Sequence, residues 1–278
     1  QLSEPPLYET LNEHMYRLNA ERVVRESMLL AVPAQKVHIL DWCEQNFVEP
    51  RSGIPYSRRS QPATALLLDL LNSDYWRSCM LVAPNQAGKS FTLAQYLFHV
   101  LFNLREDVVY GVPDLDGMWR TKWLKDILPF IEASALRHMI PKGGSGSDGG
   151  VPKLVLWNNH TTLTPMGAGG GDSQRAGATS RVVLITEVKD FGKTKVGSKE
   201  GTPYDQLVRR ALRHMGREFI FSESTITTAS NLAWQMYLQG TQTVPHFPCE
   251  SCEEYIAPER EHLIGWQNAG TEEEAREK

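Results

Sequence analysis

The sequence predicts an α/β fold in which a mostly parallel β-sheet is covered by helices on both faces. Three observations favour this class. Short apolar runs typical of buried strands alternate with helix-like segments from residue 63 to residue 225, the order expected when crossover helices join parallel strands. One strand–loop–helix unit, residues 78–104, carries a glycine and a lysine in its loop. No apolar stretch is long enough to cross a membrane, so no membrane partner is predicted.

Composition limits the classes of protein that this chain can belong to. Its 278 residues, 41% hydrophobic and 22% charged, suit one large globular domain or one domain with appendages. The formal net charge of −4 gives no overall sign of a nucleic-acid partner. Four cysteines are too few for a disulfide framework and fit a reducing cytosol. The polar, acidic N-terminus does not resemble a signal peptide.

The predicted elements divide the chain into three regions. Residues 1–50 form a predicted helical segment, because apolar side chains recur near helical spacing and a second helix can start after Pro33. Residues 51–245 form the predicted α/β domain, which opens with a turn-rich connector. Residues 246–278 are predicted to be a linker with a C-x-x-C turn and an acidic tail.

Within the central region the elements follow one another in a regular order. Helix 63–73, strand 78–84 and helix 89–104 come first, followed by strand 107–113 and a proline-broken helix over 114–134. A hairpin over 153–159 and 161–168, strand 181–188, helix 203–215 and strand 217–225 complete the domain. The glycine-rich stretches 141–152 and 169–180 are predicted to be loops.

Residues 83–90 read "APNQAGKS" and match a phosphate-binding loop, or P-loop, except that Ala83 replaces its first glycine. Gly88 can adopt the backbone conformation that brings the chain close to phosphates. Lys89 would lie against the β- and γ-phosphates, and Ser90 would hold Mg²⁺ and begin the helix. The other predicted ATP-binding residues of the loop are Pro84, Asn85, Gln86 and Ala87. The pattern therefore predicts a P-loop NTPase of the RecA/ASCE-like kind, with ATP and Mg²⁺ as ligands; a chance strand–turn–helix is the alternative.

An acidic strand end is the second part that such a site needs. "RVVLITEV", residues 181–188, has four apolar residues followed by Thr186 and Glu187. Glu187 is a candidate general base for the attacking water and, together with Ser90 and Thr186, a candidate residue for Mg²⁺. Thr186 takes the place of the aspartate that usually holds the magnesium water shell, so its hydroxyl would serve Mg²⁺ more weakly. On this reasoning, Thr186→Asp should speed ATP turnover.

Two further groups of side chains are candidates for binding. Tyr56 precedes the P-loop and could border the adenine, although an aromatic side chain at this place can equally belong to the core. Arg209, Arg210 and Arg213 fall on the predicted helix 203–215 and could contact DNA phosphates, with Arg209 and Arg213 on one face at i and i+4. A solvated basic helix is the alternative.

A C-x-x-C pair, Cys249 and Cys252, occurs near the end of the chain. A structural zinc site needs four ligands, and the chain has no second C-x-x-C, although His246 could be a third ligand. We therefore favour two reduced thiols over bound zinc.

The order of these motifs resembles a known family. "IPYSRRSQPATALLLDLL", "APNQAGKS", "TPMGAGGGDSQRAGATSRVVLITEVKDF", "SESTIT" and "HFPCESCEEY" follow one another as in the ATPase portion of tailed-bacteriophage terminase large subunits of the lambda-like kind. The resemblance covers roughly residues 40–260. It implies an ATP-hydrolysing motor that translocates double-stranded DNA into a procapsid through a portal, in the cytoplasm of a bacterial host.

The resemblance also implies roles for particular residues. Gln86 joins Gly88, Lys89 and Ser90 in the phosphate loop, and Glu187 matches the catalytic glutamate. Ser224, Thr225 and Thr227 match a coupling motif whose hydroxyls sense the γ-phosphate. Arg175 lies where related motors carry an arginine that completes the site of a neighbouring subunit in a ring; a surface or DNA-contacting arginine is the alternative.

The implied partners are double-stranded DNA, the portal, the small terminase subunit and further copies in a ring on the procapsid, although the isolated chain could be a monomer. Members of the family also carry a nuclease domain, which we expect to be absent here, as in a truncated ATPase portion. Two other functions stay open: a helicase-like nucleic-acid-dependent ATPase, and a nucleotide-binding assembly module that does not hydrolyse ATP.

Overall fold

A computed structural model describes residues 16–24, 36–141, 151–169, 177–191, 201–249, 252–257, 259, 265, 268–271 and 273–274. The chain divides into two compact units between Val37 and His38. In the first unit, residues 16–24 are helical. The second unit begins before helix α2 (Ile39–Asn46). The boundaries at residues 50 and 245 remain predictions.

The second unit is built on a six-stranded sheet with the order β1-β6-β5-β2-β4-β3. Its strands are β1 (Ser78–Val82), β2 (Val108–Val112), β3 (Val155–Leu156), β4 (Thr162–Gly167), β5 (Val182–Thr186) and β6 (Phe219–Ser224). All neighbouring strands are parallel except the β3–β4 pair, which forms the predicted antiparallel hairpin at one edge. The mostly parallel sheet predicted from the alternation of strands and helices is thereby confirmed.

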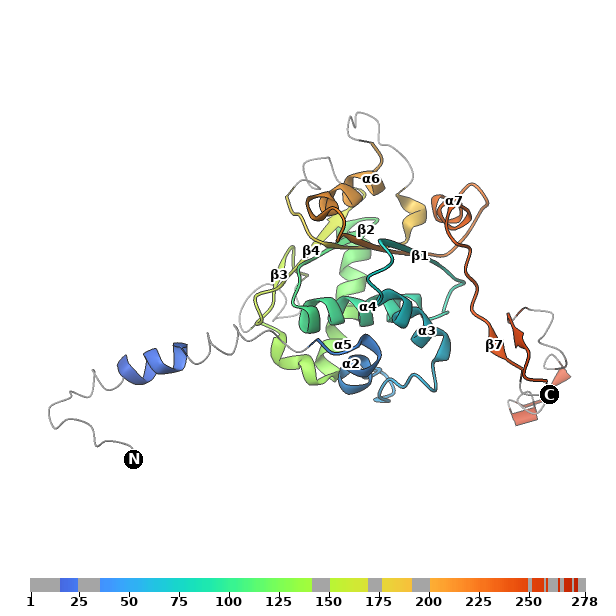
Figure 1. Cartoon of the computed structure of the whole chain (residues 1–278), viewed down its shortest axis with the longest axis horizontal. Helices are drawn as coiled ribbons and strands as arrows, with labels where there is room; N and C mark the ends of the chain where they lie inside the picture. Colours follow the sequence, from blue (N-terminus) through green and yellow to red (C-terminus); the bar gives the residue numbers. More distant parts are fainter. Residues whose placement is uncertain are drawn as a thin grey trace. The chain divides into compact units, whose positions relative to one another are not determined.

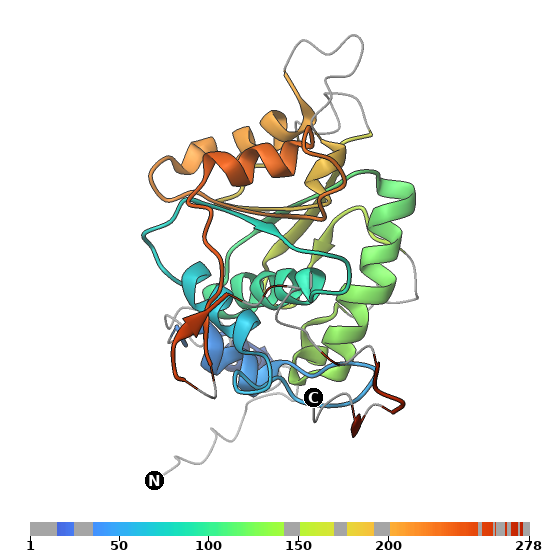
Figure 2. The same ribbon diagram turned by 90° about the vertical axis from the view of Figure 1, so that its right-hand side faces the viewer.

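Helices cover both faces of this sheet (Figures 1 and 2). On one side lie α2, α3 (Pro62–Leu71), α4 (Lys89–Phe98) and α5 (Leu128–Ala133), and on the other lie α6 (Pro203–Val208) and α7 (Leu232–Gln239). Shorter helical segments complete the unit: η1 (His99–Leu104), η2 (Leu115–Trp119), η3 (Lys122–Ile127), η4 (Ala135–Met139), η6 (Val188–Asp190) and η7 (Arg209–His214). A separate antiparallel pair joins β7 (Phe247–Pro248) and β8 (Tyr255–Ile256).

The sheet is stabilised by the burial of its two central strands, β2 and β5, on both faces. All five residues of β2 and all five of β5 are buried, as expected for strands covered on both faces. On the α6 side, Val183, Ile185 and Ile220 pack with Leu207 of α6. Trp119 and Trp123 are each 1% exposed with ring centroids 5.8 Å apart, so they belong to the core.

Two predicted helices differ from the observed elements. Residues 114–134 form the π-helical segments η2 and η3 followed by α5, where the predicted helix was simply broken at a proline. The predicted helix 203–215 ends as an α-helix at Val208 and continues as the 3₁₀ segment η7. A 3₁₀ helix has about three residues per turn, so side chains three apart are aligned. Arg210 and Arg213 therefore share a face, and the predicted i and i+4 alignment of Arg209 with Arg213 is wrong.

Among the described residues, no helix is long and apolar enough to span a membrane.

Candidate functional site

The phosphate loop lies between the end of β1 and the start of α4. Gln86 and Gly88 have positive φ angles of 64° and 78°, so the loop turns through two left-handed positions. Such turns direct successive backbone N–H groups to one side, where they can bind an anion. Gly88 is the residue before α4, and no side chain caps the helix. The first N–H groups of α4 are therefore available to a phosphate group.

Lys89 and Ser90 begin α4 at the edge of the sheet. The Lys89 side chain is 7% exposed, and its Nζ donates a hydrogen bond of 2.7 Å to the carbonyl oxygen of Pro84 within the loop. Because it lies across the loop at the helix N-terminus, this ammonium is placed to meet phosphate oxygens. The loop residues from Pro84 to Ala87 are exposed and so accessible to a ligand.

A second lysine, Lys122 of η3, reaches the same place. Its Nζ lies 2.6 Å from the Oγ of Ser90 and 3.2 Å from an Oδ of Asp126. The Lys122 side chain is also 7% exposed. Two nearly buried ammonium groups therefore flank the start of α4, which favours an anionic ligand at this site.

The acidic strand end lies two strands from the loop, with β6 between β1 and β5. Thr186 is the last residue of β5 and is fully buried. Glu187 follows with φ 54°, a left-handed conformation that is uncommon for a residue other than glycine. The Nζ of Lys189 is 3.3 Å from the Oε2 of Glu187. This left-handed residue joins the end of β5 to the short segment η6, whose first residue, Val188, is again fully buried.

A carboxylate that the motif analysis did not single out lies beside Thr186. Glu223 of β6 pairs in register with Thr186 and is 1% exposed. The Thr186 hydroxyl donates a hydrogen bond to Glu223 Oε1. The pKa of the Glu223 carboxyl is raised, mainly by burial and further by the charge of Glu187, although this hydrogen bond and the charges of Lys122 and Lys89 offset part of the rise. Glu223 therefore lies within the electrostatic reach of both lysines.

The predicted coupling motif contacts the phosphate loop. The Oγ1 of Thr225 donates a hydrogen bond of 3.1 Å to the Oδ1 of Asn85. The Oγ of Ser224 accepts a hydrogen bond of 3.3 Å from the backbone N–H of Lys189. Thr227 lies farther along, where its Oγ1 accepts from Asn231 at 3.4 Å. The end of β6 thus connects the loop after β1 with the segment after β5.

Other candidates lie elsewhere or outside the described residues. Tyr56 is 3% exposed and packs near Phe91, with ring centroids 6.3 Å apart, and its burial raises the pKa of the phenol to about 12. This places its ring in the core, and contact with adenine remains a prediction. Arg209 and Arg213 are exposed on η7, and Arg210 Nε donates to the backbone oxygen of Gln206. Arg175 falls outside the described residues.

The C-x-x-C pair forms a turn in the described part of the C-terminal region. The N–H of Cys249 donates to the backbone oxygen of Glu254, and Cys249 in turn accepts from the N–H of Glu253, both at 2.8 Å. Both cysteines are free thiols. Within the described residues, no group of three or more His, Cys, Asp or Glu side chains gathers in a way that could hold a metal. Zinc at this turn stays a prediction that rests on the spacing of the two cysteines.

Comparison with known families decides which kind of P-loop protein this is. Residues 52–278 match the family model of the phage terminase large subunit gpA, ATPase domain. The chain belongs to this family. No curated protein matches the chain in sequence.

One solved structure agrees with this assignment at the level of fold. The HK97 bacteriophage large terminase is similar with a TM-score of 0.56 and 11% identity, over 74% of this chain and 42% of that one. The chain thus spans less than half of the HK97 terminase. Two structures of the Thermus phage P74-26 large terminase ATPase domain give TM-scores of 0.41 and 0.40 with 13% and 14% identity. These cover 69% and 64% of this chain and 75% and 70% of theirs.

Within this terminase ATPase domain, the structure gathers the predicted loop residues, Thr186, Glu187, Ser224 and Thr225 along one edge of the sheet. Sequence analysis missed Lys122 and Glu223. Glu223 had a recognisable signal: it is a carboxylate inside the apolar strand "FIFSES", where a charged side chain is expensive to bury. Lys122 lies between two core tryptophans with no motif around it.

Proposed function

We propose that this chain is the ATP-hydrolysing portion of a motor that translocates double-stranded DNA into a viral procapsid. The observation that carries the proposal is the meeting of a phosphate loop, two nearly buried lysines and two carboxylates at the carboxyl edge of one parallel sheet, in a chain of the terminase ATPase family. Ligands of such open α/β sheets bind beyond the carboxyl ends of the strands.

Different residues would carry out the separate steps of ATP hydrolysis. Glu187 accepts a proton from the attacking water, whose oxygen bonds to the γ-phosphorus. The bond from that phosphorus to the β–γ bridging oxygen breaks, so ADP and phosphate are the products. Lys89 and the N–H groups at the start of α4 stabilise the negative charge on the phosphate oxygens. Lys189, 3.3 Å from the Glu187 carboxylate, limits the orientations that this side chain can take.

The donor set fits the magnesium that accompanies ATP. Mg²⁺ prefers oxygen ligands, and Ser90 contributes a hydroxyl while Glu223 contributes a carboxylate whose Oε2 is buried without a hydrogen-bond partner in the described structure. When bound, the ion would neutralise charge on the β- and γ-phosphates. Arg175 remains our candidate for the arginine that a neighbouring subunit supplies.

Coupling to DNA follows from contacts at the end of β6. Thr225 binds Asn85 of the phosphate loop, so a change in the loop on loss of the γ-phosphate can be passed to β6 and the chain beyond it. Arg209, Arg210 and Arg213 are the candidate DNA contacts, and phosphate contacts of this kind need no base sequence. The partners we expect are a portal, a small terminase subunit and further copies in a ring, in the host cytoplasm.

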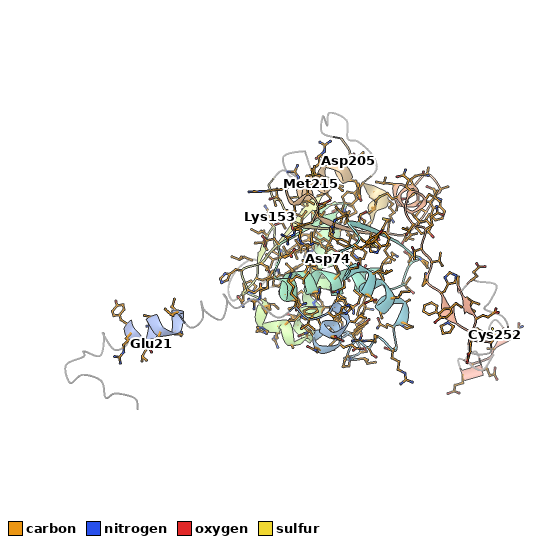
Figure 3. All side chains as sticks on the ribbon, in the orientation of Figure 1. Glu21, Asp74, Lys153, Asp205, Met215 and Cys252 are labelled. Carbon is orange, nitrogen blue, oxygen red and sulfur yellow. The ribbon has the colours of Figure 1, made fainter. Side chains whose placement is uncertain are left out.

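The test is steady-state ATP hydrolysis with magnesium, measured without DNA, with duplex DNA and with single-stranded DNA. We expect turnover that duplex stimulates more than single strand. Lys89→Ala should abolish it, whereas Lys153→Ala, which removes an exposed lysine at the start of the hairpin (Figure 3), should leave it unchanged.

Each alternative function has its own signature in this experiment. Preferential stimulation by single strands would favour a helicase-like ATPase. ATP binding without turnover under any condition, including high chain concentration, would favour a nucleotide-binding assembly module.

A further inference from the structure

The site contains a buried carboxylate beside the position where the acidic strand carries a hydroxyl. Strand β6 lies between β1 and β5, and Glu223 and Thr186 are register partners near the carboxyl ends of their strands. Neither side chain reaches solvent appreciably, with exposed fractions of 1% and 0%. The hydroxyl of Thr186 donates to Glu223 Oε1, so the two side chains meet directly.

One oxygen of the Glu223 carboxylate has no hydrogen-bond partner in the described residues. Thr186 serves Oε1, but in the described part of the chain Oε2 is buried without any hydrogen-bond partner. A buried acceptor without a partner costs roughly 1–3 kcal/mol, and more when it is charged. The Oε2 atoms of Glu187 and Glu218 are also buried without a hydrogen-bond partner in the described residues, but that of Glu223 lies beside Thr186, near the carboxyl end of β6. A ligand that uses Oε2 would explain why this residue is a glutamate rather than an apolar side chain of similar size.

The surrounding charges show what kind of ligand fits. Lys89 and Lys122 act electrostatically on Glu223, and Lys122 also contacts the Oγ of Ser90 at 2.6 Å. Ser90 thus contacts one of the two ammonium groups whose charges act on Glu223. A hydroxyl and a carboxylate are oxygen ligands of the kind that Mg²⁺ prefers, and the negative charge of a bound triphosphate would compensate the positive charges of the two lysines and of the ion.

We propose that Glu223 supplies, from β6, the carboxylate that serves the magnesium of Mg·ATP in place of the aspartate missing at Thr186. In this arrangement Ser90 and Glu223 face the ion, and Thr186 is a positioning residue whose hydroxyl orients the carboxylate. The carboxylate is thus supplied by β6, the strand next to β5, rather than by β5 itself. This inference rests on the proposed ATPase function.

The test measures binding rather than turnover. The Kd of a fluorescent ATP analogue is determined with excess Mg²⁺ and with excess EDTA, for the parent and for Glu223→Gln. We expect Mg²⁺ to tighten binding in the parent, and Glu223→Gln to reduce that tightening by about 10- to 100-fold, as when a residue supporting a metal is removed. The Kd in EDTA should stay the same, because the loop and Lys89 bind the phosphates in both variants.

Two further variants separate a metal-serving role from a purely structural one. Glu218→Gln is the matched control, because Glu218 precedes the opposite end of the same strand, and it should behave as the parent. The charge-relocated variant Thr186→Asp/Glu223→Gln restores one carboxylate at the strand end and should recover the response to Mg²⁺. It also keeps the inference testable if Glu223→Gln alone does not fold.

The outcomes are distinguishable from failure of the proposed function. Unchanged Mg²⁺ dependence in folded Glu223→Gln would overturn the inference while leaving the ATP site intact. A folded charge-relocated variant that ignores Mg²⁺ would overturn it as well. If the parent binds no nucleotide in either condition, the proposed function fails and this inference fails with it. If the parent binds nucleotide and Lys89→Ala does not, the nucleotide site at the phosphate loop stands.

Discussion

Replacing Thr186 with aspartate should destabilise the domain rather than improve it. The aspartate that the motif lacks would lie beside Glu223, whose Oε1 already accepts a hydrogen bond from the Thr186 hydroxyl. Two carboxylates on the order of 4 Å apart repel by about 4 kcal/mol at an effective dielectric constant near 20. The charges of Lys89 and Lys122 offset part of this repulsion. We therefore expect a loss of about 2 to 3 kcal/mol in unfolding free energy at pH 8.

The pH dependence of this loss identifies its cause. The buried pair would hold a proton more tightly than the two carboxyls do in the unfolded chain, so their folded-state pKa values are raised. A carboxyl whose pKa is raised in the folded state destabilises that state at pH values above the pKa of the unfolded chain. The loss in unfolding free energy therefore vanishes as the pH falls toward about 4, the pKa of a free carboxyl. Thr186→Asn is the matched control, because it has the same shape as aspartate without the charge.

The assay is thermal unfolding at pH 8 and pH 5. For a domain of this size each kcal/mol corresponds to roughly 2 to 4 °C, so Thr186→Asp should unfold roughly 4 to 12 °C below Thr186→Asn at pH 8, with a smaller gap at pH 5. Equal melting temperatures for the two variants at both pH values would refute the contact between residues 186 and 223.

Three further changes test other parts of the structure. Gly111→Ala should cost about 1–3 kcal/mol in unfolding free energy, because the new Cβ would lie 2.5 Å from a methyl carbon of Leu207 in α6. Gly177→Ala is the control and should cost little, because nothing lies within 4 Å of its Cβ. Equal denaturation midpoints for the two variants would contradict this packing. Glu187→Gln should lower ATP turnover by about 10²- to 10⁴-fold without weakening ATP binding, and retained turnover would exclude it as the base. Alkylation of the native protein, followed by mass spectrometry, should modify the exposed Cys252. It should spare Cys43, because this side chain is fully buried and its burial raises the pKa of the thiol. Comparable labelling of both cysteines would show that α2 does not pack as described.

Local sequence signals were sufficient for most of the fold. Strand β5 was predictable because five consecutive buried residues leave an apolar run. The phosphate loop was predictable because its glycine, lysine and serine occur between a strand and a helix. Both inferences need only residues that are neighbours in the sequence.

The second carboxylate was harder to predict because it depends on strand order. Thr186 and Glu223 are 37 residues apart in sequence, and their contact exists only because β6 pairs with β5 in that register. From the sequence alone, the threonine appears as a missing charge, and Thr186→Asp appears as a repair. Once β6 is known to lie beside it, the same substitution becomes a repulsion between two buried acids.

The arginines of the 203–215 segment show a second limit. Their predicted alignment assumed an α-helix, but the segment continues as 3₁₀ beyond Val208. A change from 3.6 to about 3 residues per turn alters which side chains share a face, and no local residue pattern announced it. Whether any of these arginines contacts DNA is therefore best tested one residue at a time.

ATP hydrolysis by four matched proteins tests the central claim, that a phosphate loop and a carboxylate supplied from β6 form a working magnesium-dependent ATPase site. They are the parent, Glu223→Gln, Thr186→Asp and Thr186→Asp/Glu223→Gln. The account predicts turnover in the parent, a loss of about 10²-fold or more in Glu223→Gln, and recovery in the charge-relocated double variant. It would be contradicted if Thr186→Asp alone outpaced the parent while Glu223→Gln kept full activity.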